Sequence, residues 1–137
     1  MEFVQARDAL RKSPDFAELD SSVMGVLLLT AEEVELAAGE VLFEQGVDSG
    51  DRFCLLVAGE LSVGGTGGLE IARLSPGALA GEIGIVSPQK KRTAGVRAAT
   101  ACAVLQWHFG ALPEAARQVL RPHLEKVAFE RLATGLQ

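Results

Sequence analysis

The 137-residue sequence contains only two cysteines and two histidines. Cys54 and Cys102 lie in separate apolar stretches, and neither stands at a zinc-ligand spacing from the other or from a histidine. We therefore expect two buried free thiols. His108 and His123 are also isolated from each other. The sequence thus gives no support for a metal site.

The sequence also lacks a long apolar run near its start. The longest run there, residues 23–29, has seven residues, whereas a helix needs about 20 to span a membrane. The run follows acidic residues, unlike a secretory signal, which begins with basic ones. We expect a soluble cytoplasmic protein without membrane insertion.

Positive charge is not in excess, because the net charge is −5 at pH 7. Nucleic-acid phosphates require a positive surface, so this total argues against direct nucleic-acid binding. It does not argue against a small anion, for which the local charge decides. Residues 90–92, Lys-Lys-Arg, form such a local patch, although we expect Lys90 and Lys91 themselves to be solvated.

The sequence does contain enough apolar residues for a core, 48% of the total, and its length fits one domain. From about residue 34 to residue 108, apolar residues recur with a period of two, and glycines interrupt the pattern. This is typical of short antiparallel strands in a sandwich or jelly roll. The glycine-rich residues 64–68 predict a hairpin tip, because no Gly-Lys-Ser/Thr follows them as in a phosphate-binding loop.

Helices are predicted on both sides of these strands. Apolar residues at positions 3, 6 and 10 fit one helical face. Ser21 or Ser22 is placed to cap a helix that runs to about Leu29. After the strands, residues 113–120 predict a short helix, and Pro122 predicts a kink or a restart before a further amphipathic stripe.

The most informative segment is residues 81–94, in which Glu82 and Arg92 stand ten positions apart. An ionised Glu82 only accepts hydrogen bonds, so it suits a ribose hydroxyl. Arg92 can bind two phosphate oxygens through parallel N–H bonds, which a lysine cannot do. Gly81 leaves room for backbone close to a ligand, and a helical turn over residues 82–86 would point free N–H groups at a phosphate.

These groups suit a 3′,5′-cyclic nucleotide, because cyclisation leaves one ribose hydroxyl and one singly charged phosphate. The same two residues also occur at this spacing by chance in many proteins, as ordinary surface side chains. The surrounding sequence favours the ligand-binding interpretation.

Residues 81–98 resemble the phosphate-binding cassette of cyclic nucleotide-binding domains, which occur in the catabolite activator protein, the regulatory subunits of cAMP-dependent kinase and gated channels. The family pattern is hydrophobic-Gly-Glu-hydrophobic-small-hydrophobic, then Arg-small-Ala. It reads here as residues 80–85 and 92–94. Upstream, residues 39–63 resemble the family's glycine-punctuated strands. Together the two matches cover about residues 34 to 108.

The resemblance implies a mainly β fold, an antiparallel β-roll (jelly roll) with N-terminal helices and C-terminal hinge helices. We expect a single domain, with a helical segment at residues 1–33 and the roll at residues 34–108. The cassette lies within the roll at residues 81–94, and the C-terminal helices occupy residues 109–137.

The resemblance also implies roles for the site residues. Glu82 is expected to hold the ribose 2′-OH and Arg92 the phosphate, while the amides of Ile83 and Thr93 donate to phosphate or sugar oxygens. The hydroxyl of Thr93 could bond the phosphate or the 2-amino group of a guanine, so the ligand is cAMP or cGMP. The expected binding residues are Gly81, Glu82, Ile83, Arg92 and Thr93, with Val63, Ile71 and Ala72 lining the pocket.

The resulting hypothesis is a regulatory sensor, not an enzyme. Its C-terminal helix would change position when the ligand binds and would signal to a protein partner or to a second copy of the chain. One alternative is a β-roll interaction or structural module with an unoccupied pocket. Another is a fragment of a transcription regulator of the catabolite activator type, since the roughly thirty residues after Trp107 are too few for a helix-turn-helix domain. An enzyme is the last alternative, because no nucleophile-and-base pair is recognisable.

Overall fold

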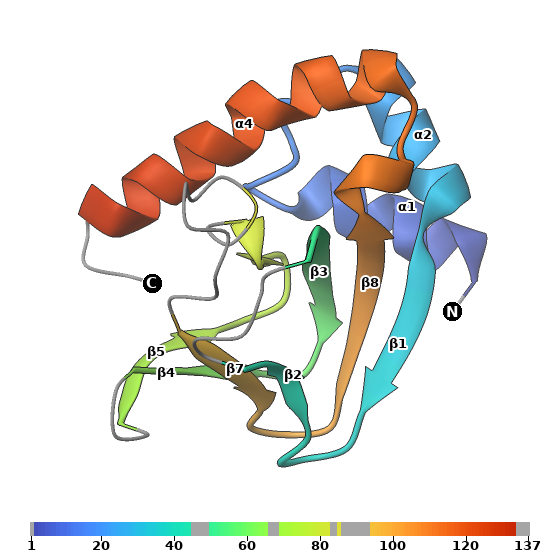
Figure 1. Cartoon of the computed structure of the whole chain (residues 1–137). Helices are drawn as coiled ribbons and strands as arrows, with labels where there is room; N and C mark the ends of the chain where they lie inside the picture. The colour runs from blue at the N-terminus through green and yellow to red at the C-terminus, as the bar shows by residue number, and fades with distance from the viewer. Residues whose placement is uncertain (1, 45–49, 66–68, 83–84, 86–93, 134–137) are drawn as a thin grey trace.

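The computed structural model describes residues 2–44, 50–65, 69–82, 85 and 94–133 (Figure 1). Within them, helices flank a run of strands. The helices are α1 (Phe3–Lys12), α2 (Ser21–Thr30) and α4 (Glu114–Ala133), with the 3-10 turn η2 (Phe109–Ala111) before α4. The strands are β1 (Glu32–Leu36), β2 (Val41–Phe43), β3 (Arg52–Ala58), β4 (Leu61–Gly64), β5 (Glu70–Leu74), β6 (Leu79–Ala80), β7 (Gly95–Ala98) and β8 (Cys102–His108).

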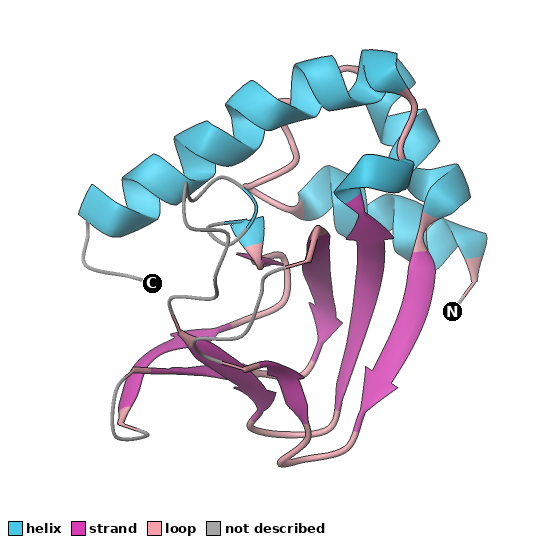
Figure 2. Ribbon diagram, in the orientation of Figure 1, coloured by secondary structure: helices cyan, strands magenta, loops and turns pink. Residues whose placement is uncertain are grey.

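The strands of this described part form two four-stranded sheets, with the orders β1-β8-β3-β6 and β2-β7-β4-β5. Neighbouring strands are antiparallel in both sheets. Figure 2 shows the helices gathered at the end of the roll opposite the β2-β7-β4-β5 sheet. The predicted fold class, an antiparallel β-roll with flanking helices, is therefore confirmed.

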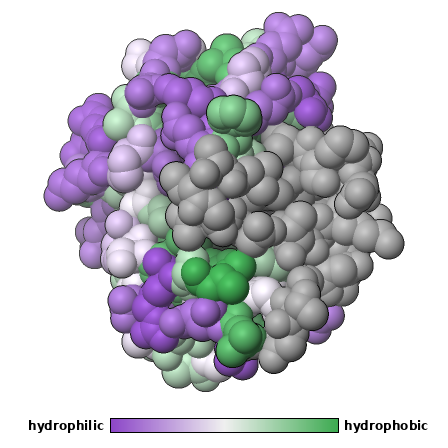
Figure 3. Space-filling view, turned by 90° about the vertical axis from the view of Figure 1, so that its left-hand side faces the viewer, coloured by the Kyte–Doolittle hydropathy of each residue, from purple (hydrophilic) through white to green (hydrophobic). Residues whose placement is uncertain are grey.

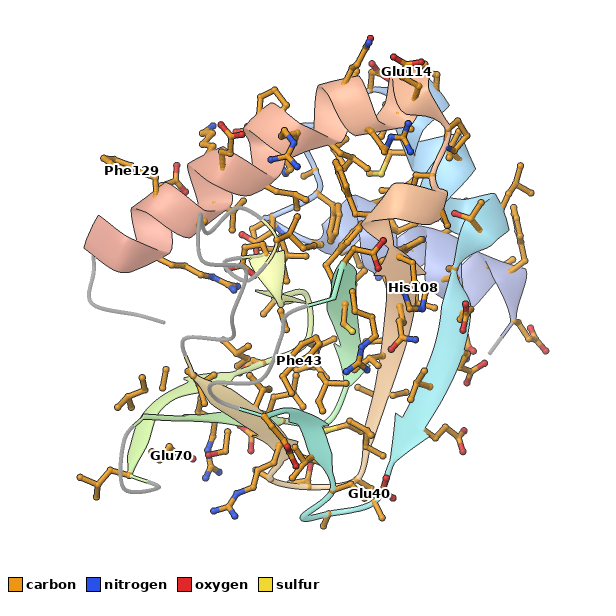
Figure 4. The ribbon with its side chains drawn as sticks, viewed as in Figure 1. Glu40, Phe43, Glu70, His108, Glu114 and Phe129 are labelled. Carbon is orange, nitrogen blue, oxygen red and sulfur yellow. The ribbon has the colours of Figure 1, made fainter. Side chains whose placement is uncertain are left out.

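Alternation along β3 divides the hydrophobic core into two parts. Successive side chains of a strand point to opposite faces, so Phe53 and Leu55 pack on the helix side while Cys54 and Leu56 pack inside the roll. Phe43 of β2 belongs to the interior cluster and lies between the sheets (Figure 4). The helix-side cluster also contains Phe16, Leu27, Trp107, Leu120 and Leu124, whereas the interior cluster also contains Val63, Ala80, Val96 and Val104.

The cap of α2 differs from the prediction. The Asp20 carboxylate accepts the Val23 N–H at 3.0 Å, and it also accepts the Ser22 hydroxyl at 2.6 Å. Ser21 and Ser22 themselves lie inside the helix. A carboxylate at this position caps a free N–H and also faces the positive end of the helix dipole, which explains why Asp20 takes the role.

The predicted restart of the helix after Pro122 is wrong, because α4 continues from Glu114 to Ala133 with this proline inside it. Proline removes one backbone hydrogen bond and crowds the preceding turn, at about 3 kcal/mol. Leu120 and Leu124, on either side, are completely buried. Each buried leucine contributes about 1.5–3 kcal/mol, so the packing of α4 on the core offsets the cost of the proline.

Candidate functional site

The turn that leads into the candidate site depends on Gly81. Strand β6 ends at Ala80, and Gly81 follows with a φ of +93°. Side chains disfavour this left-handed region, so glycine is required here by the backbone itself. Glu82 and Ile85 then have a helical backbone conformation, as the predicted helical turn requires.

Glu82 is the one charged residue of the described chain that is fully buried, with 1% of its side chain exposed. Its Oε1 accepts a hydrogen bond from Arg131 Nη1 at 2.6 Å. Within the described residues, its Oε2 is buried and has no hydrogen-bond partner. The site therefore contains a carboxylate with one oxygen bonded to Arg131 and the other placed to accept a hydrogen bond from a donor.

Burial raises the pKa of Glu82 above its ordinary value, because the surroundings disfavour the charged form. The positive charge of Arg131 and its hydrogen bond, together with the backbone amide of Glu82, act in the opposite direction and lower the pKa. Asp15 adds a smaller contribution that raises it. The ionisation of Glu82 thus depends on how closely Arg131 approaches.

Asp15 joins three parts of the chain beside Glu82. Its Oδ2 accepts the Leu79 N–H of β6 at 3.0 Å and also contacts Arg131 Nη2 at 3.3 Å. Its backbone carbonyl meets Nε2 of His123 on α4. The turn after α1, the strand before the site and the C-terminal helix are consequently linked at one residue.

The predicted lining residues do not all lie on the same side of the sheet. Val63 of β4 and Ala72 of β5 are paired in register, and both pack with the interior cluster of the roll. Ile71 falls at the register shift between the Val63–Ala72 and Gly64–Glu70 pairs, and it is 42% exposed. A lining role is therefore better supported for Val63 and Ala72 than for Ile71, whose role stays a prediction.

Three predicted site residues, Ile83, Arg92 and Thr93, lie outside the described residues. The predicted closeness of Glu82 to Arg92 therefore stays a prediction. Figure 3 shows apolar side chains gathered beside the grey residues on the face at the left of Figure 1.

Sequence reasoning missed Arg131 and Asp15 as parts of the site. From the sequence, Arg131 belongs to the amphipathic stripe predicted after Pro122, and no role at the site follows from that position. A cation within an apolar stripe was the available signal, because a partly buried arginine needs an anionic partner. Nothing in the sequence identified Glu82, 49 positions away, as that partner.

The two cysteines are free and buried, as predicted. Among the described residues, no three histidine, cysteine, aspartate or glutamate side chains are grouped so that they could hold a metal ion. The same part of the chain contains no helix that is both long and apolar enough to cross a bilayer.

A comparison with protein families matches residues 33–118 to the cyclic nucleotide-binding domain. The chain belongs to this family. The matched residues contain Gly81, Glu82 and the roll strands, whereas Arg131 lies beyond them. Strands β2 to β8, Gly81 and Glu82 therefore lie within the matched part, whereas Asp15 and Arg131 lie outside it.

Solved structures agree with this assignment. The N-terminal domain of a transcriptional regulator from Streptomyces coelicolor A3(2) is 31% identical, with 93% of this chain and 91% of that one covered and a TM-score of 0.67. A protein of Geobacter metallireducens GS-15, named as a cyclic nucleotide-binding protein, is 23% identical (92% and 97% covered, TM-score 0.74). The regulatory domain of Toxoplasma gondii PKA, crystallised with cAMP, is also 23% identical (96% and 48% covered, TM-score 0.71). The comparison with curated proteins found no match.

Proposed function

We propose that this domain binds a 3′,5′-cyclic nucleotide, cAMP or cGMP, as a sensor without catalysis and signals through helix α4. The observation that carries the proposal is Glu82, a fully buried carboxylate that follows the Gly81 turn within the matched family region. One of its oxygens has no hydrogen-bond partner among the described residues. A buried acceptor of this kind is costly unless a donor meets it. The 2′-OH of a ribose is such a donor.

The remaining roles follow the family pattern. Arg92 would bind the exocyclic phosphate oxygens in parallel, and the amides of Ile83 and Thr93 would donate to phosphate or sugar oxygens. Val63 and Ala72 would form the apolar wall, since both pack toward the interior of the roll. A singly charged cyclic phosphate needs no metal ion to neutralise it.

The choice of base stays open between adenine and guanine. A hydroxyl at Thr93 suits either a phosphate oxygen or the 2-amino group of guanine. The T. gondii relative was crystallised with cAMP, which makes cAMP the first ligand to test.

Isothermal titration calorimetry with cAMP and with cGMP tests the ligand. We expect a dissociation constant in the micromolar range or tighter for at least one of them. Arg92→Ala should weaken binding by about 10- to 100-fold, because a charge-assisted hydrogen-bond pair contributes about 1.5–3 kcal/mol. Lys90→Ala is the matched control, since this neighbouring charge is expected to be solvated, and it should change affinity by less than about threefold.

A second substitution tests the ribose role. Glu82→Gln should weaken cAMP more than 2′-deoxy-cAMP, because only the ribonucleotide uses the carboxylate. Equal losses for the two ligands would contradict the assignment of Glu82. If no cyclic nucleotide binds or raises the melting temperature, the alternative of a β-roll module with an unoccupied pocket gains support.

Helix α4 is proposed to transmit binding because it contacts the site and is also joined to the N-terminal segment. Arg131 contacts Glu82 directly. Lys126 pairs with Glu18 at 3.0 Å, and His123 meets the backbone of Asp15. A change at Glu82 would therefore alter contacts that hold the last turns of α4 against the N-terminal segment.

A partner is proposed to read the position of α4 from its outer side. Val119 and Phe129 are exposed on this helix, the latter at 73%. Phe129 points away from the rest of the molecule (Figure 4). This exposure supports contact with a partner protein or with a second copy of the chain through α4.

A second candidate function is the sensor part of a transcription regulator. The 31% identity with the N-terminal domain of the S. coelicolor regulator favours it. A mobility-shift assay on the product of the complete coding sequence, with and without cAMP, distinguishes this candidate, because a free-standing sensor would leave DNA unshifted.

A further inference from the structure

Arg131 stands out as the residue through which the end of α4 enters the candidate site. It is only 14% exposed, and it reaches two carboxylates, Oε1 of Glu82 at 2.6 Å and Oδ2 of Asp15 at 3.3 Å. It lies beyond residues 33–118, which match the family.

The arrangement leaves a specific acceptor unused. The contact from Arg131 to Glu82 uses Oε1, while Oε2 stays buried and without a hydrogen-bond partner among the described residues. Arg131 consequently does not occupy the oxygen that a ligand hydroxyl would need. A residue that competed with the ligand would be expected to cover both oxygens.

Among the described residues, Arg131 is the cation that lowers the pKa of Glu82. The described groups that face it are Arg131 from α4 and Asp15 from the turn after α1, whose carbonyl meets His123 of α4. Burial raises the pKa of Glu82, and Arg131 opposes that rise. Without Arg131 the carboxyl group would hold its proton to a higher pH.

We infer that Arg131 is a positioning residue for ligand binding: from helix α4 it holds the Glu82 carboxylate through Oε1 and leaves Oε2 to accept the ribose hydroxyl. The other terminal nitrogen of Arg131, Nη2, donates to Oδ2 of Asp15, which holds the guanidinium in place. The inference rests on the proposed function and adds to it a residue far from the cassette.

A coupling between ligand and helix follows from this arrangement. If docking of Arg131 prepares Glu82 for the ribose, the bound ribonucleotide must favour the docked position of α4 by the same factor. A 2′-deoxy ligand lacks the hydroxyl, so it would show little of this coupling. The preference for ribose and the position of α4 are thus expected to change together.

The test compares cAMP with 2′-deoxy-cAMP by calorimetry at pH 6, 7 and 8.5. Arg131→Gln should weaken cAMP by about 10-fold at pH 7 and should reduce the preference for cAMP over the deoxy analogue. The loss should shrink as the pH rises, because Glu82 regains its charge. Arg131→Lys keeps the charge and should restore part of the preference, whereas Arg121→Gln, which removes an exposed cation from the same helix, should leave it unchanged.

A second measurement does not need a ligand. A carboxyl group whose pKa is raised by folding stabilises the fold fully below its unfolded pKa of about 4.5, and this stability is lost as the pH rises through the folded pKa. Removing Arg131 raises the folded pKa further. The melting temperature of Arg131→Gln should therefore fall further below that of the wild type at pH 8 than at pH 5.

The possible outcomes separate the two ideas. If the wild type binds cAMP but Arg131→Gln keeps the full ribose preference at every pH, the positioning role is overturned while the proposed function stands. A variant that weakens both ligands equally, with a melting deficit that does not grow with pH, also overturns it. If the wild type binds no cyclic nucleotide, both proposals fail together.

Discussion

Trp107 offers the sharpest test of how the helices are attached to the roll. It is the chain's one tryptophan, on β8, and it is 1% exposed. Its indole Nε1 donates to the Leu27 carbonyl of α2 at 2.8 Å. Its ring stacks on Phe53 with a centroid separation of 5.3 Å and lies 5.9 Å from Phe16. Replacing it with phenylalanine keeps an aromatic ring but removes the donor and part of the volume.

The cost of Trp107→Phe can be estimated from these contacts. Removing the donor to the Leu27 carbonyl costs about 1 kcal/mol, and up to about 3 kcal/mol if that oxygen finds no other donor. The smaller ring leaves a gap in a packed core, which adds about 1–2 kcal/mol for a partial truncation. We therefore expect the free energy of unfolding to fall by about 2–5 kcal/mol.

Urea unfolding followed by far-UV circular dichroism measures this change, because the variant has no tryptophan fluorescence. The slope of the transition should stay unchanged, since the surface exposed on unfolding is nearly the same. Leu29→Ala is the matched control. Leu29 lies on α2, the helix that accepts the indole hydrogen bond, and it is 80% exposed, so its removal should change the free energy of unfolding by no more than about 0.5 kcal/mol.

Ligand affinity completes the test. Because the indole is buried between the sheet and the helices, Trp107→Phe should leave the dissociation constant for cAMP within about threefold under conditions where the variant is folded. An unchanged free energy of unfolding would refute the argument that Trp107 stabilises the attachment of α2 to β8. A large loss of affinity in a folded variant would instead point to contact with the ligand.

Two further predictions concern a turn and an interface. Gly59→Ala should lower the free energy of unfolding by more than about 3 kcal/mol, because a Cβ there would overlap the Ala101 carbonyl. Gly39 has a similar positive φ but no atom within 4 Å of an added Cβ, so Gly39→Ala should cost only about 1–2 kcal/mol in thermal unfolding. Equal costs for the two variants would contradict the steric argument. If α4 carries a contact between two copies of the chain, the wild type should dimerise in sedimentation equilibrium and Phe129→Glu should shift it toward monomer. A wild type that is monomeric at high micromolar concentration would exclude the homodimer and leave a different protein as the partner.

The sequence predicted those features that local patterns control. Period-two alternation with interrupting glycines predicted the strands, and alternation along β3 explains why the prediction succeeded, since each face has its own apolar cluster. Gly81 and Glu82 were proposed as site residues for the room and the acceptor that they offer a ligand, and those roles stay predictions. The positive φ of Gly81 adds a backbone reason for glycine that the sequence argument did not contain.

The failures occurred where tertiary contacts override local preferences. Pro122 would break an isolated helix, but Leu120 and Leu124 secure the helix on both sides. Asp20, and not one of the predicted serines, caps α2, because its carboxylate accepts the Val23 N–H and its negative charge is also favoured at the positive end of the helix dipole. The lining role that the family resemblance implied for Ile71 stays a prediction, and the register shift beside it could not be predicted from alternation.

The matched family region and the folding unit have different boundaries, and the difference bears on the site. Residues 33–118 contain the roll and Glu82, yet Leu120, Leu124 and Val127 of α4 complete the helix-side cluster together with Phe16 of the N-terminal segment. The segments outside the match also supply Arg131 and Asp15, which face the buried carboxylate. Glu82 thus lies within the matched region, while Arg131 and Asp15 from the flanking segments shift its pKa in opposite directions. Under the proposed function, a change in the packing of those segments would alter ligand binding even when no strand moves.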